Sequence, residues 1–163
     1  MIDASLRKAA TRVLECCRAH GLQVATAESC TGGLVAGALT EIAGSSDVVD
    51  RGYVTYSDAA KRAMLDVPAA TLKRYGAVSA QTAKAMAAGA LKHSRADLAV
   101  AITGIAGPGG GSKEKPVGLV YFAAASRSGR RLARKRLYGT IGRRRVRSAS
   151  VAEALSLLLR LAR

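Results

Sequence analysis

Residues 26–33, TAESCTGG, bring together an acid, a serine, a cysteine, threonines and two glycines. An apolar run precedes the segment and a helical pattern follows it, so Ser29 is predicted at a strand-to-helix corner, where α/β sheets collect ligands. The N–H groups of Thr31, Gly32 and Gly33 would then point out of the helix start and could hold a phosphate or the oxyanion of an attacked carbonyl. Serine and threonine also cap helices without any catalytic role, so the spacing leaves both interpretations open.

Two further stretches carry polar side chains at the ends of predicted strands. In TYSDAAK, Tyr56 and Lys61 flank a strand-to-helix boundary, and a lysine beside a serine can act as its base when burial lowers the lysine pKa. Most lysines are simply solvated, which is the competing interpretation. In AITGIAGPGGG, Thr103 and Gly104 end an apolar strand before a glycine-rich loop without the spacing or the Lys-Ser/Thr pair of a P-loop. That loop is either a flexible surface segment or a wall of a substrate site.

Histidine is scarce in this chain. His20 and His93 both lie near the ends of predicted helices, where a solvated imidazole interacts favourably with the helix dipole. A Ser-His-Asp triad or a histidine-based metal site is therefore not expected, and a general base has to be a lysine, a tyrosine or a carboxylate. Cys30 keeps a cysteine hydrolase in consideration, since thiolates are better nucleophiles than alcohols, although buried cysteines are commonly inert.

Length and composition favour a single domain over residues 1–163, with no repeat and no linker. Apolar residues make up 49% of the 163 positions, which suits a folded chain with a sizeable core. No apolar stretch approaches the ~18 residues of a membrane span, and the amino-terminal residues lack the apolar core of an export signal. Cys16, Cys17 and Cys30 have neither metal-site nor disulfide spacing, so we expect reduced thiols and a cytoplasmic location.

The chain is strongly basic, with 26 Lys and Arg against 11 Asp and Glu and a net charge of +15. Arginine is concentrated late in the sequence, in RSGRRLARKRLYGTIGRRRVR. Such a charge predicts an anionic partner, either nucleic acid or a small phosphorylated substrate. The aromatic residues near this stretch, Tyr121, Phe122 and Tyr138, are fewer than a stacking platform for single-stranded nucleic acid usually needs. A GC-rich genome also produces such a composition, so nucleic acid is not the expected main partner.

The periodicity of apolar residues predicts strands that alternate with helices. Helices are predicted at 4–19, 31–43, 59–65, from Pro68, from the N-cap Ser79 to Leu91, and from Arg143 onward. Strands are predicted at 22–27, at 52–57, in ADLAVAITG, and as a hairpin of 119–126 with 131–138. This order predicts an α/β fold, a three-layer α/β/α sandwich with a mixed central sheet.

Several of these motifs occur together in one known family. The stretches TAESCTGGLVAGALTEIAGSSDVVDRGYVTYSDAAK and AITGIAGPGGGSKEKPVGLVYFA, with GAVS and GRRRVR, resemble the CinA C-terminal domain family over about Leu6 to Leu159. The similarity is greatest to its stand-alone members, which deamidate nicotinamide mononucleotide. The resemblance implies a CinA C-terminal-domain-like fold and hydrolysis of the nicotinamide carboxamide to a carboxylate and ammonia, in pyridine-nucleotide salvage, without a metal or cofactor.

The resemblance also implies the roles of individual residues. Ser29 would be the nucleophile, Lys61 its base and Tyr56 an assisting group. Ser46 and Thr103 would line the substrate or relay protons. From their positions and chemistry, further substrate contacts are expected from the turn, the glycine-rich loop and the late arginines, namely Thr31, Gly32, Gly33, Gly104, Arg143 and Arg147.

This sequence departs from the family pattern just before the last helix. The family tends to have Gly-Asp-Arg there, whereas Gly142 and Arg143 follow an isoleucine, so the acid is missing. Arg143 and Arg147 keep phosphate recognition as the expected role of this segment. The alternative to an enzyme is a nucleotide- or DNA-binding module without turnover, as the family's association with competence suggests. The apolar surfaces permit a homodimer, and no membrane partner is expected.

Overall fold

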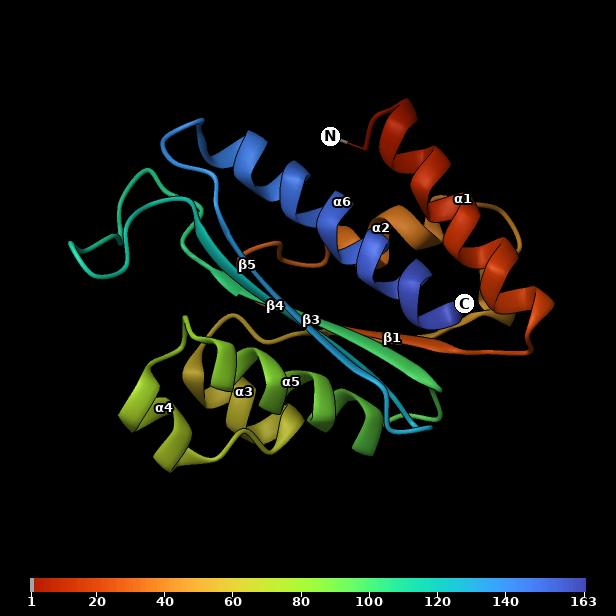
Figure 1. Cartoon of the computed structure of the whole chain (residues 1–163), viewed down its shortest axis with the longest axis horizontal. Coiled ribbons are helices and arrows are strands. Elements are labelled where there is room, and N and C mark those ends of the chain that lie inside the picture. Colours follow the sequence, from red (N-terminus) through yellow and green to blue (C-terminus); the bar gives the residue numbers. More distant parts are fainter. Residues whose placement is uncertain (1) are drawn as a thin grey trace.

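The computed structural model describes residues 2–163, and these form a five-stranded sheet between two layers of helices (Figure 1). The strands are β1 (Val24–Glu28), β2 (Val49–Val54), β3 (Leu98–Gly104), β4 (Leu119–Ser126) and β5 (Arg131–Leu137). Their order is β2-β1-β3-β4-β5, with β1 parallel to β2 and β3, and with β4 antiparallel to β3 and β5. The predicted α/β/α sandwich with a mixed sheet is confirmed.

The helices divide between the two faces of the sheet (Figure 1). One face carries α1 (Ala4–Ala19), α2 (Leu34–Thr40) and α6 (Arg143–Ala162), and the other carries α3 (Asp58–Leu65), α4 (Ala69–Tyr75) and α5 (Ala80–Lys92). A 3-10 turn, η1 (Ser45–Asp47), precedes β2. Within the part of the chain that the structure describes, no helix combines the length and apolar character needed to span a membrane.

The two faces of the sheet carry side chains of different size, because successive residues of a strand point to opposite faces. Larger apolar side chains pack under α6, with Val100, Ile102 and Phe122 among them. Alanines occupy most of the face under α5, at positions 25, 27, 99, 101, 123 and 125. These small side chains let α5 lie close to the sheet. The contact between α5 and α3 is equally close, since a Cβ on Gly89 would lie 2.0 Å from the carbonyl oxygen of Leu65.

Most element boundaries agree with the sequence prediction, and the exceptions are the helix after the TAESCTGG turn and the second strand. Ser79 caps α5 through its side chain, and His20 and His93 are the C-cap residues of α1 and α5, as predicted. The helix predicted over 31–43 is shorter and begins at Leu34. Gly32 and Gly33 have φ angles of 60° and 92°, in the left-handed region that glycine adopts without strain. Because this conformation is not that of a right-handed helix, α2 cannot begin before Leu34. The strand predicted at 52–57 lies at Val49–Val54.

Candidate active site

Ser29 lies at the carboxyl end of β1, beside the end of the neighbouring parallel strand β3. Its backbone N–H donates to the carbonyl oxygen of Ile102 at 3.0 Å. The next strand is fixed to the same corner, because the N–H of Thr55 donates to the carbonyl oxygen of Glu28 at 2.7 Å. Three chain segments that are distant in sequence therefore converge on the serine, as expected for the carboxyl edge of parallel strands.

Glu28 is fully buried and holds the turn that follows Ser29. Its carboxylate accepts hydrogen bonds from the backbone N–H groups of Gly33 (3.1 Å), Val35 (3.0 Å) and Ala36 (2.9 Å), and from the hydroxyl of Thr26 (3.3 Å). The first N–H groups of a helix lack partners within the helix, and its positive end favours a carboxylate. The acid of TAESCTGG is therefore an internal cap for α2.

This cap corrects the expectation that the amides of the turn face outward. The N–H of Gly33 donates to Glu28, and the N–H of Gly32 donates to the carbonyl oxygen of Ser29 at 3.0 Å. Thr31 is fully buried, and its carbonyl oxygen accepts from Nη2 of Arg147 at 2.9 Å. The start of α2 already holds an anion from within the protein, so the N–H groups of Gly32 and Gly33 rigidify the turn instead of facing a ligand.

Lys61 reaches Ser29 from α3 through the protein interior. Its side chain is 1% exposed, and Nζ lies 3.0 Å from the carbonyl oxygen of Thr55 and 3.3 Å from Oγ of Ser29. Burial lowers the pKa of Lys61, and the carboxylate of Asp58, with Oδ1 at 4.0 Å from Nζ, opposes this shift. A lysine with a lowered pKa is more readily a neutral amine, which can accept a proton from the serine.

Cys30 follows Ser29 but has the wrong electrostatic surroundings for a nucleophile. It is buried, and burial raises the pKa of its thiol to about 12. The reactive form of cysteine is the thiolate, which such a pKa disfavours at neutral pH. The geometry therefore favours Ser29 over Cys30 at this corner.

A hollow of about 270 Å³ opens in front of Ser29 and Lys61. Its wall includes Thr103 and Gly104 from the end of β3 and the glycine-rich loop that follows, so that loop is part of the candidate site. Oγ1 of Thr103 donates to the carbonyl oxygen of Ala77 at 2.7 Å, which ties the end of β3 to the segment before α5. The hollow is lined by Ser29, Cys30, Tyr56, Asp58, Lys61, Ala77, Val78, Thr103, Gly104, Ile105, Ala106, Gly107, Gly109, Gly110 and Arg143.

Arg143 and Tyr56 meet at the rim of this hollow. Nη2 of Arg143 donates to the hydroxyl of Tyr56 at 2.8 Å, and Nη1 donates to the carbonyl oxygen of Gly107 at 2.9 Å. Both side chains are exposed to solvent. The start of α6 thus brings a guanidinium to a site whose serine, Ser29, lies more than a hundred residues earlier in the sequence.

The chain is similar in sequence to a known protein family. The model of the CinA C-terminal domain matches residues 6–162. The chain belongs to the CinA C-terminal domain family. It is 49% identical over 158 residues to the nicotinamide-nucleotide amidohydrolase PncC of Escherichia coli K12, which covers 97% of this chain and 95% of that protein. Identity to the protein of the same name from Enterobacter agglomerans is 50% over 138 residues, covering 85% of this chain and 84% of that one.

A solved structure of a family member has nearly the same fold. The competence/damage inducible protein CihA from Agrobacterium tumefaciens is 56% identical and superposes with a TM-score of 0.98, covering 100% of this chain and 99% of that one. The resemblance to the CinA family seen in the sequence is therefore confirmed over almost the whole chain.

Five of the predicted substrate-binding residues do not line the hollow, namely Thr31, Gly32, Gly33, Ser46 and Arg147. Ser46 is exposed in η1, which precedes the amino end of β2. Ser29 follows the carboxyl end of β1, and since β1 and β2 are parallel, the two serines lie at opposite ends of the strands. Arg147 lies behind the turn, on the carbonyl of Thr31. The sequence argument missed Asp58, although its position three residues before Lys61 on a helix was a usable signal.

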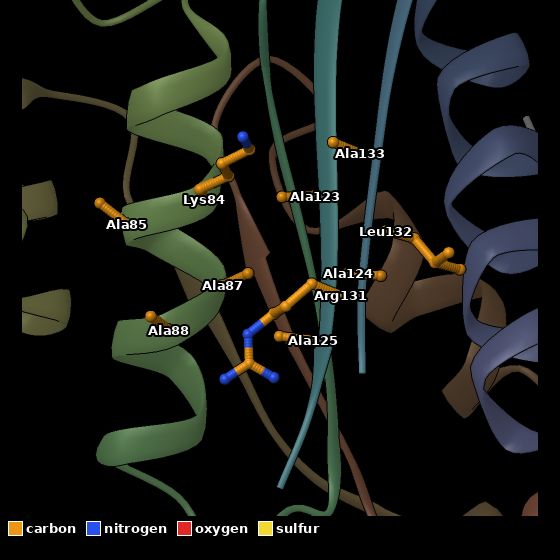
Figure 2. Close-up of a pocket in the computed structure, with 10 residues that line it drawn as sticks. All are labelled: Lys84, Ala85, Ala87, Ala88, Ala123, Ala124, Ala125, Arg131, Leu132 and Ala133. Atoms are coloured by element: carbon orange, nitrogen blue, oxygen red, sulfur yellow. The ribbon is translucent and has the colours of Figure 1, made fainter. Parts of the chain in front are cut away.

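A larger hollow of this CinA-family chain lies between α5 and the β4–β5 hairpin and measures about 560 Å³ (Figure 2). Alanines of β4, β5 and α5 line most of it, and Lys84 and Arg131 lie at its edges. None of its lining residues is a serine, a threonine, a cysteine, a carboxylate or a histidine. Within residues 2–163, no group of three or more His, Cys, Asp or Glu side chains is placed to hold a metal ion.

Proposed function

We propose that this chain hydrolyses the carboxamide of nicotinamide mononucleotide to a carboxylate and ammonia, with Ser29 as nucleophile and Lys61 as its base. The observation that carries this proposal is the buried Nζ of Lys61, 3.3 Å from Oγ of Ser29, at an opening lined by the glycine-rich loop. The names of the PncC relatives supply the substrate class, nicotinamide nucleotides. A Ser-Lys pair also suits a chain with two histidines, both at helix ends away from this hollow.

The reaction proceeds in two halves with Lys61 in both. The neutral amine takes the proton of Ser29 Oγ while Oγ attacks the carboxamide carbon, and the resulting ammonium gives a proton to the leaving nitrogen, so that ammonia departs. Water then loses a proton to Lys61 as it attacks the ester on Ser29. The ester bond breaks, Oγ regains its proton from Lys61, and the carboxylic acid ionises on release.

Arg143 supplies a binding group for the phosphate of the substrate. A guanidinium offers several N–H donors in a planar fork that fits phosphate, and Arg143 lines the hollow while remaining exposed to solvent. Its two present acceptors are a neutral hydroxyl and a carbonyl oxygen, both weaker partners than a phosphate. Tyr56, which also lines the hollow, would then be released to contact the nicotinamide ribose or ring.

Ammonia release tests the proposal directly. The purified chain should release ammonia from nicotinamide mononucleotide, less efficiently from the riboside, and least from nicotinamide, with Ser29→Ala as the inactive control. A binding module without turnover, the alternative suggested by the charge of +15, would release none and would bind DNA with a steep salt dependence. A homodimer and a place in pyridine-nucleotide salvage also belong to the proposal, and light scattering measures the former.

A further inference from the structure

Asp58 is a carboxylate in the candidate site that the proposed mechanism does not use. It is the first residue of α3, but the helix is capped by the preceding Ser57, whose Oγ accepts from the N–H of Ala60 at 3.0 Å. The Asp58 side chain is 57% exposed, lines the 270 Å³ hollow, and makes no hydrogen bond to any residue in the described range 2–163. It is the one carboxylate among the described lining residues.

The hollow is lined by charged side chains of both signs, which have different neighbours. Lys61 must be neutral to act as the base, and in that state it does not balance the charge of Asp58, 4.0 Å away. Arg143 donates to Tyr56 and Gly107 and not to Asp58. The site therefore presents a negative charge next to the Ser29–Lys61 pair and a positive charge held by Tyr56 and Gly107. The complementary substrate has a cation next to its carboxamide and an anion further away.

We propose that Asp58 determines specificity by selecting a carboxamide carried on a cationic ring. This inference rests on the proposed function, because the nicotinamide ring of the mononucleotide is a pyridinium whose positive charge lies close to the carboxamide. Free nicotinamide and reduced, dihydropyridine nucleotides have neutral rings and gain nothing from the carboxylate. The attraction is expected to act on the substrate as it binds and on the reacting complex alike, since the ring keeps its charge throughout.

The carboxylate of Asp58 makes Lys61 a less effective base. The negative charge of Asp58 opposes the lowering of the Lys61 pKa that burial produces, so it disfavours the neutral amine. Removing the charge should therefore act in opposite directions on two substrates. A cationic substrate loses attraction, while a neutral substrate loses nothing and meets a lysine that is more often neutral. A carboxylate that merely stabilises the start of α3 predicts no such difference between substrates.

The test compares Asp58→Asn with Asp66→Asn on two substrates of the same shape. One is nicotinamide mononucleotide, and the other is the isosteric nucleotide in which a neutral benzamide ring replaces the pyridinium. Asp66 is a matched control because it lies at the other end of α3, pairs with Lys92 and His93, and has a φ of 53° that asparagine tolerates. Ammonia release gives kcat/KM, and calorimetry with both nucleotides gives Kd.

Asp58→Asn should lower kcat/KM for the pyridinium nucleotide by about two- to fivefold, the range of a partly exposed charge pair, and should leave the benzamide nucleotide unchanged or faster. Asp66→Asn should change neither. Equal losses on both nucleotides, or no loss on the pyridinium, would overturn the inference. Absence of ammonia from both nucleotides with the wild-type chain would instead contradict the proposed function. In that event the Kd values decide, and Asp58→Asn must weaken only the pyridinium nucleotide for the inference to stand.

Discussion

Two hollows among those of the described residues show that volume and chemical equipment do not go together. The hollow between α5 and the β4–β5 hairpin is the larger, about 560 Å³ against about 270 Å³ in front of Ser29. The larger one is lined mostly by alanines, whereas the smaller one contains a serine, a buried lysine, a carboxylate and an arginine. Apolar volume favours binding in general. Catalysis requires ionisable groups that converge on one point and whose pKa values are shifted by burial.

The difference has its origin in the sheet. The carboxyl ends of β1, β2 and β3 bring residues of three segments together, and the connections to α2, α3 and the glycine-rich loop add further polar groups. The alanine groove forms where small side chains on the α5 face continue onto β5, which extends beyond the helix that covers β3 and β4 (Figures 1 and 2). One hollow follows from topology, and the other from the size of the side chains.

The largest expected effect is at Ser29. Ser29→Ala removes the nucleophile and should lower kcat/KM for nicotinamide mononucleotide by more than about a thousandfold. Cys30→Ala should retain most activity, because the thiol is held protonated by its burial. Ammonia release by both variants checks the assignment. An inactive Cys30→Ala beside an active Ser29→Ala would reverse it and would make the smaller hollow a cysteine site.

Substitution of Lys61 should lower kcat/KM nearly as much, because its role is to accept a proton and not to supply a positive charge. Lys61→Arg keeps a positive charge, but a guanidinium does not deprotonate in proteins, so this variant should be almost as slow as Lys61→Ala. The wild-type kcat/KM should rise with pH as Lys61 becomes neutral, at a pH below that of an ordinary lysine. Near-normal turnover by Lys61→Arg would reduce the residue to an electrostatic support.

The same burial predicts how stability depends on pH. Because the pKa of Lys61 is lowered in the folded chain, the unfolded chain binds a proton more readily between that lowered pKa and the ordinary value of 10.5. The free energy of unfolding contributed by Lys61 therefore increases as pH rises through this window and is reduced as pH falls. Lys61→Met lacks this titration. The Tm of wild type relative to that of Lys61→Met should therefore rise from about pH 7 to about pH 10, as measured by thermal melts.

The two arginines at the start of α6 should separate in a substrate comparison. Arg143→Ala should lower kcat/KM by about ten- to a hundredfold with the nucleotide and little with the riboside, which lacks the phosphate. Arg147 holds the carbonyl of Thr31 behind the turn, so Arg147→Ala should affect both substrates equally. Equal losses on both substrates for Arg143→Ala would assign it to the fold and leave the phosphate to another group.

The sequence predicts what depends on local pattern and leaves out what depends on assembly. The strand-to-helix corner at Ser29 and the caps at Ser79 and His93 follow from patterns a few residues long, and the structure confirms them. The internal cap by Glu28 could not be predicted, because a carboxylate after a strand points equally well to solvent until the strand partners are known. Ser46 shows the same limit, since only the parallel pairing of β1 and β2 places it at the far edge.

The smallest expected effect is that of an alanine-to-valine substitution in the larger hollow, compared with the same substitution in the smaller one. Ala133→Val adds two methyl groups to the groove on the exposed strand β5, where valine suits a strand, so kcat/KM should stay within about twofold and stability should change by less than ~1 kcal/mol. Ala77→Val adds the same groups to the hollow in front of Ser29 and should displace the substrate enough to lower kcat/KM by about tenfold. Ammonia release and thermal melts measure both variants. A large loss of turnover in Ala133→Val with an unchanged Tm would connect the groove to catalysis and end the contrast between the two hollows.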